Sequence, residues 1–124
     1  MFLLDTYVFL WALAEPKRLS VNARTILSRA DLDIFVSMAS LWELTIQQQH
    51  SRIISTASFA SEVDRLGFHL LDITIPHLVA VKNLPLLHQD SFDHMLIAQA
   101  KVEGLTLITD NKKLQDYGIS VLAG

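Results

Sequence analysis

Short apolar runs alternate with amphipathic stretches along this chain, and this alternation limits the possible folds more than any other feature. Phe2–Leu4 and Ile34–Val36 are apolar throughout, which is typical of strands buried on both faces. Strands that are separated by helices favour crossover connections and a parallel sheet. The sequence therefore predicts an α/β fold in which a central parallel sheet of four to five strands carries helices on both faces.

Hydrophobic spacing and turn residues place the individual elements. Strands are predicted at Phe2–Leu4, Ile34–Val36, Phe68–Ile73, Leu105–Thr109 and Ile119–Leu122. Helices are predicted at Tyr7–Ala14, Ser20–Ala30, Ala39–Gln49, Phe59–Leu66, Thr74–Lys82, Ser91–Glu103 and Lys112–Asp116. Ser20 and Ser91 are the expected caps of their helices, and Gly67 and Gly104 are the expected stops.

Composition narrows the class of protein. The chain has 124 residues, which predicts one domain over residues 1–124. It contains no cysteine, so disulfides, thiolate nucleophiles and cysteine metal sites are excluded. The longest apolar run, Tyr7–Ala14, is far shorter than the roughly 18 residues of a membrane span. No basic segment precedes it, and we expect a cytoplasmic protein without membrane contact.

Polar residues follow two of the predicted strands. Asp5 ends the first strand, and Thr109, Asp110 and Asn111 end the fourth. Ligands of open parallel sheets bind beyond the carboxyl ends of the strands, so these side chains are expected to converge if the two strands are neighbours. Asp5 is equally well explained as the cap of the helix that follows it.

Two further acids lie in apolar surroundings. Glu43 forms a capping box with Ser40, or it lies in the second turn of a helix capped by Ser37 and points inward. Asp93 falls in the first turn of a nearly all-apolar helix, where the helix dipole favours a carboxylate. Because that helix is expected to be buried, a carboxylate at its mouth also suits a functional site.

The types of residue indicate a chemistry. Separated carboxylates without cysteine favour a hard cation such as Mg²⁺ or Mn²⁺, which commonly serves phosphodiester hydrolysis. The five histidines show no ligand pair at a spacing of four, and we expect them on the surface or in loops. The chain has no glycine-rich phosphate loop and no nucleophile elbow.

Several stretches together resemble PIN-domain ribonucleases, and more narrowly the VapC toxins of bacterial type II toxin–antitoxin systems. They are Leu3–Thr6 with Phe9–Leu13, Val36–Ser37 with Ala39–Glu43, Leu84–Pro85 with His88, Asp90, Phe92–Asp93 and Met95–Ala100, and Gly104–Thr109. The resemblance implies a PIN-like α/β/α sandwich and a metal-dependent endoribonuclease that acts as a toxin. An inert PIN-like binding or assembly module is the alternative.

The resemblance also implies roles for individual residues. Asp5, Glu43 and Asp93 are similar to the family's catalytic acids, which hold Mg²⁺ or Mn²⁺ together with a fourth acid. The family places that acid two residues after the threonine at position 109, where this chain has Asn111, so either Asn111 or the preceding Asp110 fills the position. Supporting roles are expected for Thr6, Thr109, Asn111 and Asp90.

Partners follow from the same resemblance: an RNA substrate, a small cognate antitoxin and a second copy in a homodimer. Tyr7 stands where relatives often have histidine, and Gln47–His50 stands where they often have lysine. Candidate cations around the site are Arg52, Lys82, Lys101, Lys112 and Lys113. Candidate apolar contacts for partners are Trp11, Leu19, Ile26, Ile46, Ile53 and Ile54.

Overall fold

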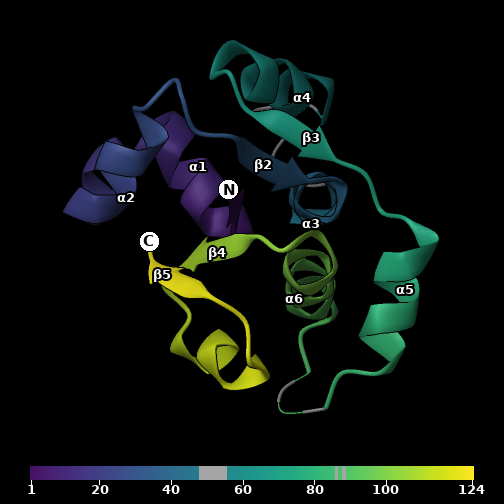
Figure 1. The fold of residues 1–124 in the computed structure, drawn as a ribbon. Helices are drawn as coiled ribbons and strands as arrows, with labels where there is room; N and C mark the ends of the chain where they lie inside the picture. The colour runs from purple at the N-terminus through teal and green to yellow at the C-terminus, as the bar shows by residue number, and fades with distance from the viewer. Residues whose placement is uncertain (48–55, 86, 88) are drawn as a thin grey trace.

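A five-stranded parallel sheet forms the centre of the protein (Figure 1). The structure is a computed structural model, and it describes residues 1–47, 56–85, 87 and 89–124. The strands are β1 (Phe2–Leu4), β2 (Ile34–Ser37), β3 (His69–Leu71), β4 (Thr106–Thr109) and β5 (Val121–Ala123). Their order across the sheet is β3-β2-β1-β4-β5, and every neighbouring pair is parallel. The predicted α/β fold is confirmed.

Helices connect successive strands. They are α1 (Thr6–Ala14), α2 (Val21–Leu27), α3 (Met38–Gln47), α4 (Thr56–Arg65), α5 (Ile75–Lys82) and α6 (Ser91–Glu103), with the 3-10 helices η1 (Pro16–Arg18) and η3 (Lys112–Tyr117). In the part of the chain that is described, no helix is long and apolar enough to cross a membrane.

The sheet separates two hydrophobic cores. Successive strand residues point to opposite faces, so Leu4 and Ile108 pack with the helices α1 to α4, whereas Leu3 and Leu107 pack with α6 and η3. All four of these side chains are fully buried. Both faces are therefore covered, as expected for strands that are apolar throughout.

The strand order changes direction between β1 and β4. From β1 the chain builds β2 and β3 on one side and then returns to build β4 and β5 on the other. Leu4 pairs with Ile108 across this junction, and the Asp5 amide donates a hydrogen bond to the Ile108 carbonyl at 2.9 Å. The predicted neighbours are confirmed, so Asp5 and the residues after Thr109 leave the sheet side by side.

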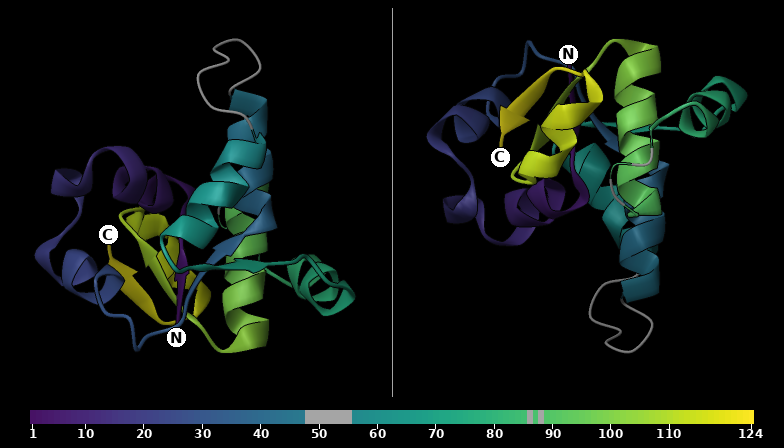
Figure 2. Two further views of the ribbon diagram at one scale, coloured as in Figure 1. Left: turned by 90° about the horizontal axis from the view of Figure 1, so that it is seen from above. Right: turned by 90° about the horizontal axis from the view of Figure 1, so that it is seen from below.

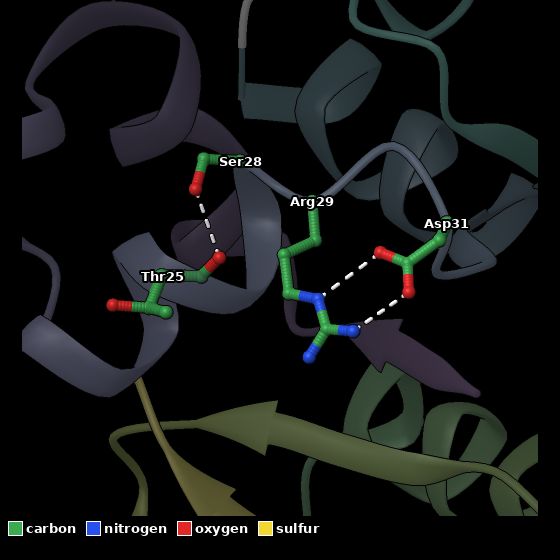
Figure 3. A network of polar contacts seen from close by, with 4 residues as sticks. All are labelled: Thr25, Ser28, Arg29 and Asp31. Atoms are coloured by element: carbon green, nitrogen blue, oxygen red, sulfur yellow. Dashed lines mark hydrogen bonds and ion pairs between the residues drawn. The ribbon is translucent and has the colours of Figure 1, made fainter.

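Several predicted ends of helices and strands differ from the structure: α4 begins at Thr56 rather than Phe59, and β3 is confined to His69–Leu71. The helix expected to reach Ala30 ends at Leu27, where local polar contacts replace helical hydrogen bonds: the Ser28 hydroxyl donates to the Thr25 carbonyl at 2.9 Å, and Arg29 pairs with Asp31 (Figure 3). Asp90, not Ser91, caps α6.

Two histidines also depart from their expected exposure. His77 on α5 is fully buried, and His94 on α6 is 8% exposed. His69 is exposed as expected, and His50 and His88 lie outside the described residues. His77 accepts a hydrogen bond from the Thr74 amide through Nδ1 (3.0 Å), so Nε2 carries the proton and donates to Glu103 (2.8 Å). This contact joins α5 to α6.

α5 stands apart from the sheet beside α6 in both views of Figure 2. Its buried side carries His77, and partly buried Ala80 and Val81 pack against the core under α6. Its outer side carries Ile75, Leu78 and Val79, which are 74%, 53% and 54% exposed. This helix therefore leaves an apolar face open to solvent.

Candidate active site

Asp5 lies at the point where β1 becomes α1, and its two carboxylate oxygens have different partners. Oδ1 accepts a hydrogen bond from the Tyr7 amide at 2.9 Å, which caps α1. Oδ2 accepts one from the Thr109 hydroxyl at 2.5 Å, which joins the ends of β1 and β4. The helix cap and the site are therefore not alternatives for Asp5, because its side chain caps α1 and contacts the end of β4 at the same time.

Glu43 lies in the second turn of α3. The helix begins at Met38, and the Ser37 hydroxyl accepts a hydrogen bond from the Ala39 amide at 3.0 Å. The Ser37 cap is therefore confirmed, and the capping box of Ser40 and Glu43 is wrong. Glu43 Oε1 instead accepts from the Thr6 hydroxyl at 2.7 Å, and that hydroxyl lies 2.9 Å from Ser40 Oγ. These contacts tie α3 to the first turn of α1.

Asp93 lies in the first turn of α6, next to the capping residue Asp90. Asp90 Oδ1 accepts from the amides of Phe92 and Asp93 at 2.9 and 3.1 Å. Asp93 Oδ2 accepts from Nδ2 of Asn111 at 3.4 Å, a contact that reaches α6 from the loop after β4. Each of the three acids is thus held by a polar side chain from another element.

The three carboxylates influence one another electrostatically. Burial, followed in size by the negative charges of Asp90, Asp5 and Glu43, raises the pKa of Asp93 to about 7. Burial also raises the pKa of Asp5 and of Glu43, while the Thr109 and Thr6 hydroxyls act to lower them. The fold therefore brings Asp5, Glu43, Asp90 and Asp93 into one electrostatic neighbourhood at the carboxyl edge of the sheet.

Asp110 and Asn111 take different positions at this edge. Asp110 is exposed and acts on Asp5 through its charge, which raises the pKa of Asp5. Asn111 faces Asp93 with its amide nitrogen, while its Oδ1 accepts from the Lys113 amide at 3.1 Å and caps η3. The backbone amide of Asn111 donates to the Thr109 hydroxyl at 3.1 Å. Asn111 thus links η3, β4 and α6.

The donor chemistry of this edge suits a hard divalent cation. Its side chains offer carboxylate, hydroxyl and amide oxygens, which Mg²⁺ and Mn²⁺ prefer. A divalent ion would also relieve the mutual repulsion that contributes to the raised pKa values. Within the described ranges, no three acidic or histidine side chains are close enough together to form a ready coordination sphere. Binding an ion would require these carboxylates to move closer together.

Several carboxylates elsewhere in the chain are paired with cations. Glu15 pairs with Arg18, Asp31 with Arg29 (Figure 3) and Glu62 with Arg65, all on exposed surface. Such pairs contribute little to stability. The partners of Asp5 and Glu43 that the structure records are hydroxyl and amide groups. The acids of the site are therefore held in a different way from the acids of the surface.

Four of the cations predicted around the site are exposed, and Arg52 lies outside the described residues. Lys112 and Lys113 begin η3, directly after Asn111. Lys101 lies near the far end of α6, about 12 Å along the helix from Asp93. Its predicted place around the site is therefore wrong. Of the predicted apolar contacts, Leu19 is a core residue, Trp11 and Ile26 pack partly buried against the core, and Ile46 is exposed. Ile53 and Ile54 fall outside the described residues.

Two aromatic features beside the acids were not predicted as parts of a site. Tyr7 is 46% exposed, and its hydroxyl accepts from Gln47 Nε2 at 3.0 Å. Trp42 is 59% exposed, and its ring meets that of Phe92. The available signal was adjacency in sequence, because Trp42 precedes Glu43 and Phe92 precedes Asp93.

Comparisons with known proteins agree with this architecture. Residues 2–119 match the PIN domain family. Ribonuclease VapC22 of Mycobacterium tuberculosis is 30% identical over 118 residues, which cover 93% of this chain and 90% of the relative.

Two solved structures share the fold at lower identity. VapBC2 from Rickettsia felis, bound to a DNA fragment from its promoter, aligns with a TM-score of 0.76 and 20% identity over 98% of this chain and 97% of that one. A toxin–antitoxin complex from Klebsiella pneumoniae aligns with a TM-score of 0.69 and 17% identity over 99% and 97%. With its five parallel strands and the match over nearly its whole length, this chain belongs to the PIN domain family.

Proposed function

We propose that this protein is a metal-dependent endoribonuclease that acts as the toxin of a type II toxin–antitoxin module. The observation that carries the proposal is the gathering of Asp5, Glu43 and Asp93 from three elements at the carboxyl edge of the sheet, with each pKa raised. Perturbed carboxylates gathered at such an edge are typical of functional sites. The similarity to a ribonuclease of the VapC type supports RNA as the substrate.

Asp5, Glu43 and Asp93 would hold the ion. Asp110, whose negative charge raises the pKa of Asp5, would be the fourth acid of the site. A bound Mg²⁺ or Mn²⁺ supplies Lewis-acid polarisation of the phosphoryl group and activation of water. The remaining residues orient the ligands: Thr109 holds Asp5, and Thr6 holds Glu43.

Asp90 and Asn111 have supporting roles in this proposal. Asp90 fixes the first turn of α6 and so sets the position of Asp93. Asn111 donates to the Asp93 carboxylate and stabilises its charged form, which is the form that binds a cation. Cytoplasmic action follows from the proposal, because the RNA substrates of a bacterial toxin are made there. The antitoxin would bind as a separate small protein, as in the toxin–antitoxin complexes with the same fold.

The test is metal-dependent cleavage of single-stranded RNA by the purified protein. Asp5→Asn and Asp93→Asn should each lower the cleavage rate by about 100-fold or more, because both remove a ligand charge. Mn²⁺ should raise the Tm of the native protein but not that of the variants. Asp64→Asn, which removes an exposed carboxylate on α4, is the matched control and should cleave normally.

Two results would contradict the proposal. Full cleavage by Asp93→Asn would remove this carboxylate from the chemistry. An unchanged Tm at millimolar Mn²⁺, together with no cleavage, would favour the inert PIN-like binding module instead.

We further propose that a second copy of this chain packs against the outer face of α5. Ile75, Leu78 and Val79 form an exposed stripe at helical spacing. The exposed residues Asp72 and Lys82 lie three residues beyond the two ends of this stripe. A two-fold axis perpendicular to this helix pairs it with an antiparallel copy, which brings each Asp72 toward the Lys82 end of the other copy.

Sedimentation velocity tests this dimer. Leu78→Asp should convert the dimer to a monomer, because it places a charge in the centre of the apolar stripe. Val21→Asp, at a position on α2 that is 69% exposed, is the control and should remain dimeric. A Leu78→Asp protein that is still a dimer would exclude α5 as the contact.

A further inference from the structure

Trp42 is the feature of the site that the proposed hydrolysis leaves unused. It lies on α3 immediately before Glu43 and is 59% exposed. The exposed indole offers a broad apolar face, on which another planar ring can stack. A group that covers Trp42 would thus lie close to the proposed site.

A second ring holds Trp42 in place. The Phe92 ring lies 5.1 Å away, centroid to centroid, at 71° in an edge-to-face arrangement. Phe92 is half-buried on α6 and directly precedes Asp93. The aromatic pair therefore bridges α3 and α6, the helices that carry Glu43 and Asp93. The indole is consequently fixed relative to two of the three acids.

The charges around the site also indicate how a substrate is held. Neither α1 nor α3 contains a lysine or arginine, and the lysine of α6, Lys101, lies near its far end, whereas Lys112 and Lys113 follow Asn111 at the start of η3. Nucleic-acid binding that depends on phosphate neutralisation needs such cations. Stacking of a base on an aromatic ring needs none, and it requires the base to be unpaired.

We propose that Trp42, supported by Phe92, stacks on an unpaired RNA base next to the scissile phosphate and so makes the protein select single-stranded segments. This inference rests on the proposed ribonuclease activity and adds a specificity-determining contact to it. Base–aromatic stacking corresponds to a factor of about 5 to 100 in affinity.

A protein partner is the competing occupant of this surface. Met38, Trp42 and Ile46 lie at intervals of four on α3 and are 37%, 59% and 43% exposed, so they form one stripe. The contact between Trp42 and Phe92 reaches from this stripe toward Asp93. RNA is favoured because the aromatic member of the stripe is the one that adjoins the acids.

The experiment measures RNA binding separately from cleavage. A single-stranded oligonucleotide and the same strand in a duplex are titrated into Asp5→Asn protein, and tryptophan fluorescence is recorded. Because Trp42→Ala removes the reporting indole, the affinity of every variant is measured from the fluorescence anisotropy of a label on the oligonucleotide. The single strand should quench the fluorescence, and Trp42→Ala in this background should weaken its binding by about 5- to 100-fold. Trp42→Phe should recover most of the affinity because it keeps a stacking ring. Ile46→Ala, on the same stripe, is the matched control and should bind normally.

The outcomes separate the two occupants and the two proposals. Equal binding by Trp42→Ala and its parent would overturn the stacking contact, whatever the cleavage assay shows. Equal losses in Trp42→Ala and Ile46→Ala, together with a changed sedimentation coefficient, would assign the stripe to a protein contact instead. Quenching by single strands without cleavage by the native protein would keep the stacking site and reject the proposed hydrolysis.

Discussion

The two ends of α6 hold carboxylates in opposite ways. At its carboxyl end, Glu103 accepts a hydrogen bond at 2.8 Å from His77, a fully buried side chain of the neighbouring helix. At its amino end, Asp93 lies near three other carboxylates, and its pKa is raised to about 7. Glu103 thus joins two helices, whereas Asp93 lies where its surroundings disfavour the charged form of its carboxylate.

This difference distinguishes an acid that joins two helices from the acids of the proposed site. A buried polar group contributes to stability when its hydrogen bonds are satisfied by the fold. Carboxylates that lie close together have raised pKa values in the folded state. Their ionisation at neutral pH therefore lowers the free energy of unfolding. The amino end of α6 thus carries an acid with the raised pKa that is typical of functional sites, whereas at the carboxyl end Glu103 joins α6 to α5.

Removing the contact between His77 and Glu103, which joins α5 to α6, should have the largest effect on stability. His77→Ala deletes the contacts to Thr74 and Glu103 and leaves a cavity between α5 and α6, so we expect the free energy of unfolding to fall by about 2–4 kcal/mol. Urea denaturation measures it. His69→Ala, at an exposed histidine on β3, should change it by less than about 0.5 kcal/mol. Similar values for the two variants would show that the His77 contacts do not stabilise the fold.

Changing Asp93 should have a smaller effect of opposite sign. The pKa of Asp93 is about 7 in the folded protein and has an ordinary value of 3.8 when unfolded. Between these values the folded state binds more protons, so stability falls as the pH rises from about 4 to 7. Asp93→Asn cannot ionise and should be more stable than the native protein at pH 8 by about 1–2 kcal/mol, a value reduced by solvent screening.

Metal-free denaturation curves at pH 4.5 and pH 8 measure this difference. The advantage of Asp93→Asn should be much smaller at pH 4.5, where the folded carboxylate is protonated and only ionisation of the unfolded carboxylate still contributes. An advantage that is equal at both pH values would mean that repulsion between carboxylates is not its cause.

Replacing Asn111 by aspartate should give the smallest change in stability. It also tests metal binding most directly. Asn111→Asp replaces a donor to Asp93 by a like charge, so metal-free stability at pH 8 should fall by about 0.5–1.5 kcal/mol. The extra carboxylate should also strengthen Mn²⁺ binding, seen as a larger rise in Tm at equal Mn²⁺. A smaller rise would indicate that Asn111 serves the site better as a neutral donor.

The sequence by itself determined the sheet and the edge where the acids gather. Apolar strands such as Leu105–Thr109 have few alternatives to a sheet buried on both faces, because both of their sides must leave water. The alternation of strands and helices then limits the topology to parallel crossovers, and the polar residues at the strand ends follow from it. Asp5 and Thr109 could therefore be expected to meet.

The tertiary structure decided which partner each polar side chain received. Whether Ser37 or Ser40 capped α3, and whether Asp90 or Ser91 capped α6, depended on where the chain left the neighbouring strand or loop. The burial of His77 depended on the docking of α5 against α6, which joins residues 26 positions apart in sequence. The pairing of Trp42 with Phe92 has the same origin. Periodicity describes one element at a time, whereas these contacts depend on how separate elements pack together.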